Sequence, residues 1–243
     1  MDINRSLSLV AVADNKVLET IKALLLSRKR LNQFFIDEVI LLTSKKINKK
    51  YLHKLKVVRI KPINSFKEYN DFIIKDLHKY ISSTHILLIQ WDGFVINGHK
   101  WNEKFLDFDY IGSPFIPRAQ NYSYGRNPNG KFYSVGNGGF SLRSLKLLQA
   151  AKKYNLKDNF KITNNHEDGF FCVMHRDFLE KKGFKYATFS VAKEFAIESP
   201  LSFDEILNLP LGFHGKKMLF IIKFFFIKTI FQKLLTLMNL NFK

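Results

Sequence analysis

Short apolar runs alternate with stretches of helical spacing along the first 92 residues of the chain. The apolar runs predict four strands, at residues 6–13, 38–43, 55–60 and 86–92. After the first strand, apolar residues recur every three or four positions and predict a helix over residues 17–26. Ser65, with Glu68 three positions later, predicts the capped start of a second helix that continues to about residue 82. This order of elements predicts an α/β fold with a mixed, mostly parallel central sheet.

The pattern is less regular after residue 92. Residues 117–131 are rich in Asn, Gly, Pro, Tyr and Arg and predict a long loop. The remaining patterns predict a strand at 132–142, a helix at 144–154, a helix at 167–183 and a strand at 186–195. We find neither an internal repeat nor a linker that divides the chain. We therefore expect one domain over residues 1–215 and a C-terminal appendage over residues 216–243.

Composition narrows the classes of protein that fit this sequence. Hydrophobic residues make up 46% of the 243 positions, which is enough for a sizeable core. The single cysteine, Cys172, excludes an internal disulfide and a cysteine-rich zinc site, and it fits a reducing compartment. The formal net charge of +18 suits nucleic acid, an anionic membrane or phosphorylated small molecules as partners. No zinc-finger, helix-turn-helix or aromatic RNA-binding signature accompanies the lysines, so a solvated basic surface accounts for most of them.

The strand predicted at residues 86–92 ends in the polar sequence Gln90-Trp91-Asp92, which Gly93 follows. A carboxylate at the C-terminal end of a buried strand faces the crevice in which open α/β sheets bind ligands. Such an acid can hold a divalent cation, and the cation in turn can hold a diphosphate. The alternative is an ordinary strand end at which Asp92 is simply solvated.

Glycines interrupt the later strand-like run at residues 135–143. Gly138 and Gly139 would let a ligand approach the backbone closely, and Asn137 offers both a hydrogen-bond donor and an acceptor. Arg143, at the end of the run, could pair with a phosphate. A β-bulge or a tight turn without a ligand is the alternative interpretation.

Two further polar clusters lie downstream. Glu167 and Asp168 are adjacent carboxylates at a predicted helix start, where they either cap the helix or act as a general base with a positioning acid. His214 lies between glycines in a non-helical segment and could ligate a metal, while the following Lys216 could reach a phosphate as a point charge. A single histidine of this kind is otherwise structural or simply exposed.

Taken together and in this order, the clusters resemble a microbial family of glycosyltransferase-like proteins that is catalogued mainly as a domain of unknown function. The resemblance covers roughly residues 6–216 and rests on Gln90–Val95, Trp101, Asp109–Gly112, Gly136–Arg143, Glu167–Asp168 and Gly212–Gly215. That family is similar in turn to nucleotide-sugar-dependent transferases of the GT-A fold. The resemblance therefore implies a single GT-A-like, Rossmann-like domain that transfers a sugar from a nucleotide-sugar donor.

The resemblance also implies roles for individual residues. In GT-A enzymes an Asp-x-Asp motif binds Mn²⁺ and the donor diphosphate. Here Gln90-Trp91-Asp92 stands in its place, so Asp92 and the late His214 are the implied ligands of Mn²⁺ or Mg²⁺. Asp168 is the implied catalytic base, with Glu167 as the second catalytic candidate. The implied donor-binding residues are Ala13, Asp14, Asn15, Gln90, Trp91, Asp92, Asn137, Gly138, Gly139 and Lys216, and the acceptor-binding residues are Trp101, Tyr110 and Glu167.

The C-terminal residues 216–243 contain lysines but no acid, and their later part separates into an apolar and a polar helical face. A helix lying in the interface of an anionic membrane suits this pattern better than a spanning helix, which would bury at least three lysines. The alternative is a helix packed on the catalytic domain or on a second copy of the chain, as in a homodimer. No secretory signal peptide is visible, so we expect a cytoplasmic protein, peripheral on the inner face of the membrane.

The leading hypothesis is a metal-dependent glycosyltransferase that acts on a glycan or lipid-linked acceptor in cell-surface polysaccharide or lipopolysaccharide biosynthesis. An inverting mechanism with a carboxylate base is the first choice, and a retaining mechanism, which needs no such base, is the alternative. Two alternatives remain open: a basic nucleic-acid-binding or nuclease domain, and a non-catalytic carbohydrate-binding module. Binding to nucleic acid would depend strongly on salt. A transferase should instead bind a nucleoside diphosphate saturably with Mn²⁺, and no nucleic-acid partner is expected for it.

Overall fold

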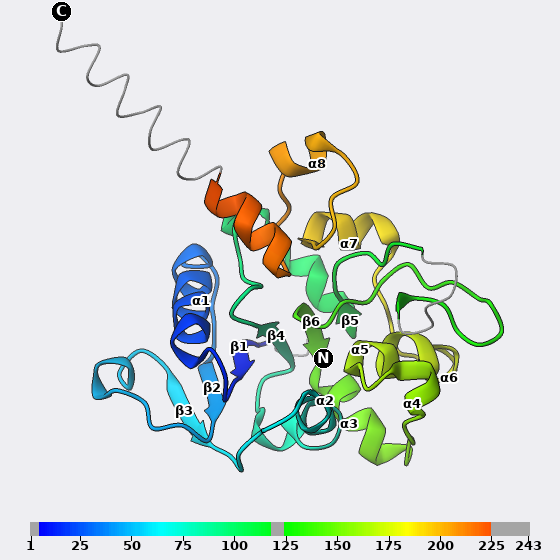
Figure 1. The fold of residues 1–243 in the computed structure, drawn as a ribbon, viewed down its shortest axis with the longest axis horizontal. Helices are drawn as coiled ribbons and strands as arrows, with labels where there is room; N and C mark the ends of the chain where they lie inside the picture. The colour runs from blue at the N-terminus through cyan, green and yellow to red at the C-terminus, as the bar shows by residue number, and fades with distance from the viewer. Residues whose placement is uncertain (1–4, 118–123, 225–243) are drawn as a thin grey trace, which may run out of the picture.

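The chain is built around a six-stranded sheet. The structure is a computed structural model and describes residues 5–117 and 124–224 (Figure 1). The strands are β1 (Leu7–Val12), β2 (Val39–Thr43), β3 (Lys56–Arg59), β4 (His85–Ile89), β5 (Tyr110–Ile111) and β6 (Phe140–Ser144). Their order is β3-β2-β1-β4-β6-β5; β1 to β4 run parallel, and β6 is antiparallel to both β4 and β5. The predicted α/β fold with a mixed, mostly parallel sheet is confirmed.

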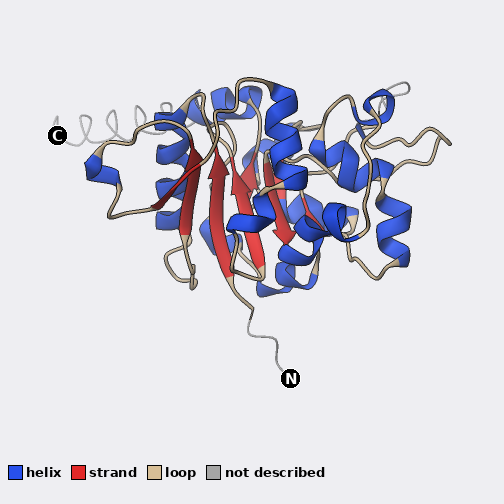
Figure 2. Cartoon of the chain, turned by 90° about the horizontal axis from the view of Figure 1, so that it is seen from below, coloured by secondary structure: helices blue, strands red, loops and turns tan. Residues whose placement is uncertain are grey.

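Helices cover both faces of this sheet (Figure 2). The main ones are α1 (Val17–Arg30), α2 (Phe66–Lys75) and α3 (Leu145–Lys153). β1 is buried along its whole length, and its side chains alternate between two cores. Leu9 and Ala11 pack in the core that contains α1, whereas Val10 and Val12 pack in a core formed with α2 and α3. Because both faces of the strand are buried, it is apolar throughout except for Ser8, which is itself buried.

The start of α2 agrees with the prediction. Ser65 Oγ accepts a hydrogen bond from Glu68 N at 3.1 Å, and Glu68 Oε2 accepts one from Asn64 N at 2.8 Å. The two side chains thus satisfy two backbone donors at the helix start. The helix ends earlier than predicted, at Lys75, and a 3₁₀ turn (Leu77–Tyr80) carries the chain toward β4.

The strand predicted at residues 132–142 is wrong in extent. It begins only at Phe140, as β6, because the preceding segment bends away from an extended course. We call residues 136–139 the glycine turn. Asn137 within it has a positive φ of 59°, a backbone conformation that a continuous strand does not contain.

The strand predicted at residues 186–195 is wrong in kind, because most of it forms a helix, α7 (Phe189–Phe195). Thr188 Oγ1 accepts a hydrogen bond from Val191 N at 3.4 Å and caps this helix, and Ala192 and Phe195 are buried. A second, two-stranded parallel sheet follows, formed by β7 (Ala196–Ile197) and β8 (Gly212–Phe213), with α8 (Phe203–Leu207) between them in the chain.

The helix predicted at residues 167–183 is present but interrupted. Its parts are α5 (Glu167–Gly169), a π-helical segment η6 (Phe170–Met174) and α6 (Arg176–Lys181). Such π-helical turns occur frequently at functional sites, and this one begins two residues after Glu167 and Asp168, which we call the acid pair. The shorter elements are α4 (Phe160–Thr163) and 3₁₀ turns at Lys49–Tyr51, Gly98–Lys100 and Glu103–Asp107.

The predicted C-terminal helix begins as expected. Residues 216–224 are helical and are drawn in orange to red in Figure 1. Met218 is buried against Ile197 and Phe213, whereas Phe220 is 71% exposed. The rest of the predicted amphipathic tail, residues 225–243, lies outside the described residues. Within residues 5–117 and 124–224, no helix is long and apolar enough to cross a membrane.

Candidate functional site

The loop after β4 and the loop after β8 meet at the carboxyl end of the sheet. Two backbone hydrogen bonds between Gln90 and Gly93, both of 3.1 Å, close a tight turn that presents Asp92. His214 follows β8 directly, and Gly215 N donates a hydrogen bond to Asp92 O at 2.9 Å. These backbone contacts bring Asp92 and His214 together although they lie far apart in the chain.

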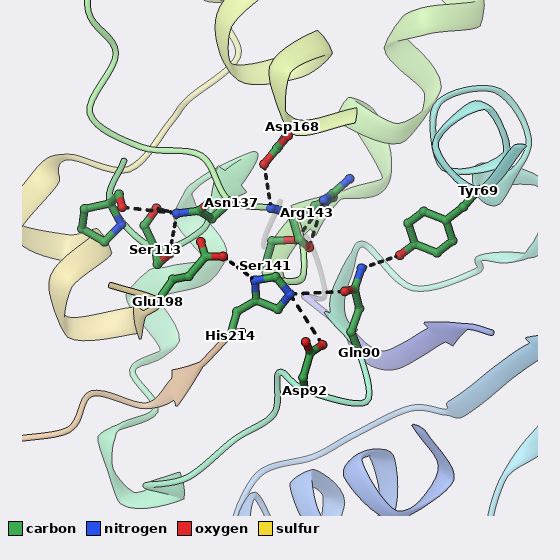
Figure 3. Close-up of polar contacts among 12 residues, drawn as sticks. Tyr69, Gln90, Asp92, Ser113, Asn137, Ser141, Arg143, Asp168, Glu198 and His214 are labelled. Carbon is green, nitrogen blue, oxygen red and sulfur yellow. Dashed lines mark hydrogen bonds and ion pairs between the residues drawn. The ribbon is translucent and has the colours of Figure 1, made fainter. Parts of the chain in front are cut away.

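The side chain of His214 lies at the centre of a polar cluster (Figure 3). Its Nε2 is 3.3 Å from Gln90 Oε1 and 3.8 Å from Asp92 Oδ1, and its Nδ1 is 3.0 Å from Glu198 Oε1. Gln90 keeps this orientation because its Nε2 donates to Tyr69 Oη at 2.9 Å. We call Gln90, Asp92, Glu198 and His214 the histidine cluster.

The charges around His214 favour its protonated form. Burial acts to lower the pKa of His214, but the hydrogen bond to Glu198 and the negative charges of Glu198, Asp92 and Asp168 outweigh it and raise the pKa. When Nδ1–H is donated to Glu198 and the ring is neutral, the Nε2 lone pair faces the oxygens of Gln90 and Asp92. These three electron-rich atoms repel one another, and either a proton on Nε2 or a metal cation between them would remove that repulsion.

This set of donor atoms fits a divalent cation. Asp92 is only 7% exposed, and in the described parts of the chain no hydrogen bond reaches its carboxylate. A histidine whose second ring nitrogen donates to a carboxylate is a common form of metal ligand. Within residues 5–117 and 124–224, however, no three His, Cys, Asp or Glu side chains form a metal-binding group. Asp92 and His214 would therefore need Gln90 Oε1 or substrate oxygens as further ligands.

A cavity of about 360 Å³ opens beyond the carboxyl ends of β1 and β4, beside the histidine cluster. We call it the donor cavity, because its lining includes the predicted donor-binding residues Ala13, Asp14, Asn15, Gln90 and Trp91. The connections through α1 and α2 run over opposite faces of the sheet, so β1 and β4 flank its topological switch point. Open α/β sheets bind ligands at this point.

Asp14 holds the wall of the donor cavity together. Its Oδ1 accepts hydrogen bonds from Thr43 Oγ1 at 2.9 Å and Ser44 N at 2.6 Å, and its Oδ2 accepts one from Ile63 N at 2.7 Å. Burial acts to raise the pKa of Asp14, but these hydrogen bonds outweigh it and lower the pKa below its ordinary value. Asp14 thus stays ionised and ties the ends of β1 and β2 to the loop after β3.

Two exposed lysines flank Trp91 at the edge of the donor cavity. Lys16 Nζ is 5.9 Å and Lys216 Nζ is 5.8 Å from the centre of the Trp91 ring. The structure therefore brings Lys216, which lies near the end of the domain in sequence, next to residues from the end of β1. Together the lysines place positive charge at the side of the cavity, where an anionic ligand group would be attracted.

The glycine turn packs closely against protein side chains. A Cβ atom on Gly139 would lie 2.0 Å from His214 Nε2, and one on Gly138 would lie 1.8 Å from Glu167 Oε1. Both positions therefore need glycine so that His214 and Glu167 can come this close. The approach of Gly138 and Gly139 to a donor stays a prediction.

Arg143 does not face a ligand, and its predicted pairing with phosphate is wrong. Its guanidinium forms two contacts with the Glu167 carboxylate, Nη1–Oε2 at 2.6 Å and Nη2–Oε1 at 2.8 Å. The side chains of Arg143 and Glu167 are 0% and 5% exposed. Because both oxygens of Glu167 are engaged by Arg143, we interpret Glu167 as a residue that positions its neighbours.

Asp168 lies beside this pair but has no cationic partner in the described residues. Its Oδ2 accepts a hydrogen bond from Gly138 N at 3.1 Å, and its Oδ1 accepts one from Gly169 N at 2.8 Å. Burial, together with the negative charge of Glu167, raises the pKa of Asp168 to about 6. A carboxylate of this kind is ionised at neutral pH and is more basic than an ordinary aspartate, which suits a general base.

Trp101 and Tyr110, implied to bind the acceptor, belong to the core instead. Trp101 is 7% exposed and packs edge to face on Phe105, and its Nε1 donates to Glu103 at 3.0 Å. Tyr110 is fully buried in β5, with the Arg143 guanidinium 5.2 Å from its ring centre. Neither side chain lines the donor cavity or a second, larger cavity that also lies beside the histidine cluster.

The second of these cavities, of about 600 Å³, lies on the other side of the histidine cluster. We call it the apolar cavity, because proline, phenylalanine and aliphatic side chains form much of its lining. Two of its lining residues contact the site: Glu198 through His214, and Pro114, whose carbonyl accepts a 3.2 Å hydrogen bond from Asn137 Nδ2. Glu198 has no local sequence signature, because it reaches His214 only through the pairing of β7 with β8.

Comparison with known proteins places the chain in a family. A family model described as "Protein of unknown function (DUF5672)" matches residues 53–214, which is two thirds of the chain. The chain belongs to this family. The predicted membership in a family of unknown function is thus confirmed. The DUF5672 match contains the whole histidine cluster and the acid pair, whereas β1 and the residues at its end precede it. No curated protein sequence matches the chain.

Solved glycosyltransferase structures are among the matches to this DUF5672 protein. A crystal structure of the galactosyltransferase LgtC with donor and acceptor sugar analogs has 17% sequence identity and a TM-score of 0.47, over 86% of this chain and 87% of that protein. A structure of an LgtC active-site mutant has 16% identity, with the same TM-score and coverage. The apo form of the glycosyltransferase GlyE from Streptococcus pneumoniae has 14% identity and a TM-score of 0.42, over 87% of this chain and 54% of GlyE.

Proposed function

We propose that this protein is a metal-dependent glycosyltransferase that moves a sugar from a nucleotide-sugar donor to a glycan or lipid-linked acceptor. The observation that carries the proposal is the position of the histidine cluster between two cavities. Gln90 lines the donor cavity, Glu198 lines the apolar cavity, and His214 contacts both side chains. Such an arrangement brings two substrates to one point, as a transfer reaction requires.

In this proposal Asp92 and His214 hold the cation, Mn²⁺ or Mg²⁺, with Gln90 beside them. When bound, the cation offsets the negative charge that develops on the diphosphate leaving group. The nucleoside lies in the donor cavity, next to Ala13 and Asn15 at the end of β1. Lys16 and Lys216, which flank Trp91, attract the diphosphate from the side of the cavity.

Asp168 is the base of the proposed reaction. The acceptor oxygen forms a bond to the anomeric carbon while the bond from that carbon to the diphosphate oxygen breaks. The bonding electrons leave with the diphosphate, and the hydroxyl proton passes to the Asp168 carboxylate. In an inverting transfer the acceptor attacks from the face opposite the leaving group. Glu167, paired with Arg143, takes no proton and positions α5 and the glycine turn.

We further propose that the protein works at the inner face of a membrane, in cell-surface polysaccharide or lipopolysaccharide biosynthesis. The net charge of +18 and the lysine-containing tail support this location, because anionic head groups attract basic segments near the bilayer. An acceptor that is itself lipid-linked would be reached most easily there.

Calorimetric titration of the full chain with a nucleoside diphosphate, with and without Mn²⁺, tests the proposal. We expect Mn²⁺ to tighten binding roughly tenfold to a hundredfold in the parent, and Asp92→Asn to lose this gain. Asp37→Asn is the matched control. Asp37 is exposed and lies before β2, at the amino end of the sheet, so this variant should keep the full effect of Mn²⁺.

The same experiment can contradict each part of the proposal. Equal effects of Mn²⁺ on the parent and on Asp92→Asn would refute the cation site. Strongly salt-dependent binding of DNA or RNA, with no binding of any nucleoside diphosphate, would refute the transferase and favour a nucleic-acid-binding domain. A panel of nucleotide sugars, followed by the release of nucleoside diphosphate, would then identify the donor.

A further inference from the structure

The apolar cavity has the volume of a small-molecule site, about 600 Å³. Its inner wall is apolar: Phe115, Ala196 and Ile197 line it, and each is at most 8% exposed. Most of its polar lining residues gather in the exposed segment 199–208, at the outer edge. An occupant therefore meets apolar surface inside and polar groups near solvent.

The apolar lining continues to the outside of the molecule. Phe189 and Leu201 both line the cavity although they are 46% and 71% exposed. Lys193 Nζ pairs with Glu205 Oε1 at 2.9 Å, and Glu205 Oε2 accepts a 2.9 Å hydrogen bond from Leu201 N. These contacts hold the segment around α8 against α7 and so keep the outer opening of the cavity in place. A long apolar group can therefore pass from the cavity to solvent or to a bilayer.

The side chain of Glu198 lies between the inner end of the cavity and the proposed reaction centre. Glu198 lines the cavity and contacts His214 Nδ1, and the opposite nitrogen of the ring faces Asp92 (Figure 3). A group attached to the reacting part of an acceptor would thus enter apolar surroundings almost at once. The apolar inner wall offers an extended glycan few of the hydrogen-bonding partners that it needs along its length.

We infer that the apolar cavity binds the alkyl chain of a glycolipid acceptor, with at most one sugar residue between that chain and the reacting hydroxyl. The inference rests on the proposed function and adds the chemical class of the acceptor. An alkyl chain matches the inner wall and the exposed apolar mouth, because each methylene moved from water into such surroundings is favourable.

Alkyl glycosides with one sugar and chains from methyl to octyl test the inference without any transfer reaction. Calorimetry on the full chain, with each glycoside below its micelle concentration, should show binding that tightens about threefold to fourfold per methylene until the cavity is filled. Leu201→Asp should weaken octyl glycoside binding roughly tenfold and leave methyl glycoside binding unchanged. Leu207→Asp is the matched control, because Leu207 is 60% exposed near Leu201 but does not line the cavity.

The outcomes separate this inference from the proposed function. If a nucleoside diphosphate binds with Mn²⁺ but methyl and octyl glycosides bind equally, the alkyl site is refuted and the transferase stands. If the octyl glycoside binds in a manner sensitive to Leu201→Asp while no nucleotide binds, the alkyl site stands and the transferase is refuted. A phenyl glycoside that binds as tightly as the octyl glycoside would refute the alkyl assignment. Equal losses in Leu201→Asp and Leu207→Asp would also refute it, since adsorption to the outer surface would then explain the binding.

Discussion

Two charged clusters lie against the glycine turn, and they differ in how completely their charges are compensated. On one side, Arg143 and Glu167 form a bidentate pair that is almost entirely buried. On the other side, the one ion-pair partner of the Asp92 carboxylate among the described residues is the His214 ring, at 3.8 Å, and two cavities adjoin the histidine cluster. A buried ion pair whose charges neutralise each other, and which lines neither cavity, suits a structural role. A carboxylate whose charge is only partly neutralised, in a cluster next to two cavities, suits a site that takes up a cation and substrates.

The acid pair shows that neighbours in sequence can belong to different clusters. Glu167 and Asp168 are both buried, at 4% and 9% exposure. Glu167 is neutralised by Arg143, whereas Asp168 is held by two backbone N–H groups and has a pKa raised to about 6. In the proposed reaction, this difference makes Asp168 the candidate for the proton transfer and Glu167 the residue that supports it.

The largest expected effect concerns Asp168. Asp168→Asn keeps the size of the side chain and removes the proton acceptor, so turnover should fall roughly 10²–10⁴-fold while donor affinity is retained. The measurement is the rate of nucleoside diphosphate release, together with calorimetric binding of the donor. Asp37→Asn, at the opposite end of the sheet, should behave as the parent does. A loss of donor affinity as large as the loss of turnover would move Asp168 into the donor site.

The next effect concerns the buried pair. Arg143→Met leaves the Glu167 charge buried without a partner, so the free energy of unfolding should fall by about 3–5 kcal/mol. Urea unfolding followed by circular dichroism measures this change. In the double variant Arg143→Met with Glu167→Leu, part of the loss should be recovered, because no uncompensated charge remains.

A surface ion pair provides the matched control for Arg143→Met. Lys75 contacts Asp71 at 2.8 Å, and their side chains are 59% and 29% exposed. Lys75→Met also replaces a cation by methionine, but it should cost less than about 1 kcal/mol because water and salt already screen the pair. Similar losses for Arg143→Met and Lys75→Met would mean that the buried pair is not a scaffold.

The smallest expected effect is a pH dependence. The pKa of Asp168 is raised from 3.8 to about 6 in the folded protein, so the folded state binds this proton more tightly than the unfolded state does. Its contribution to stability is therefore largest below pH 3.8 and is lost as the pH rises through 6. Asp168→Asn should remove this loss, which we expect to be on the order of 1–3 kcal/mol.

Urea unfolding of the parent and of Asp168→Asn at pH 4, 5, 6 and 7 measures this difference. The free energy of unfolding of the variant, relative to the parent, should rise over this range. If the difference in free energy of unfolding between the two proteins stays constant over this pH range, the pKa of Asp168 is not raised. The contrast between Asp168 and Glu167 would then disappear.

The parallel half of the fold could be predicted because each of its elements carries a local signal. β1, β2 and β4 are buried on both faces and form apolar runs, and the Ser65 cap marks the start of α2. Asp92 and His214 also carry local signals, a strand-end acid and a histidine between glycines. Their meeting was expected only through the family resemblance and not from a local signal, because their contact depends on the bond from Gly215 N to Asp92 O.

The second half was harder to predict because its elements are short and are defined by long-range pairing. Residues 186–195 look like an apolar strand, yet the Thr188 cap and the spacing of Ala192 and Phe195 produce α7. Trp101 and Tyr110 were misassigned because a buried aromatic and a ligand-stacking aromatic look alike in sequence. Glu198 was missed because only the pairing of β7 with β8 gives it a role.

The link between Gly215 and Asp92 has a consequence for the order in which the protein is made. A ribosome adds about 5–20 residues per second, so the 122 residues from Gly93 to His214 inclusive take roughly 6–24 s to synthesise. During that interval β1 to β4 and the walls of the donor cavity already exist as nascent chain. The proposed cation ligands, Asp92 and His214, come together only after β8 has emerged, so a chain stopped short of residue 214 would contain the walls of the donor cavity but not the complete histidine cluster.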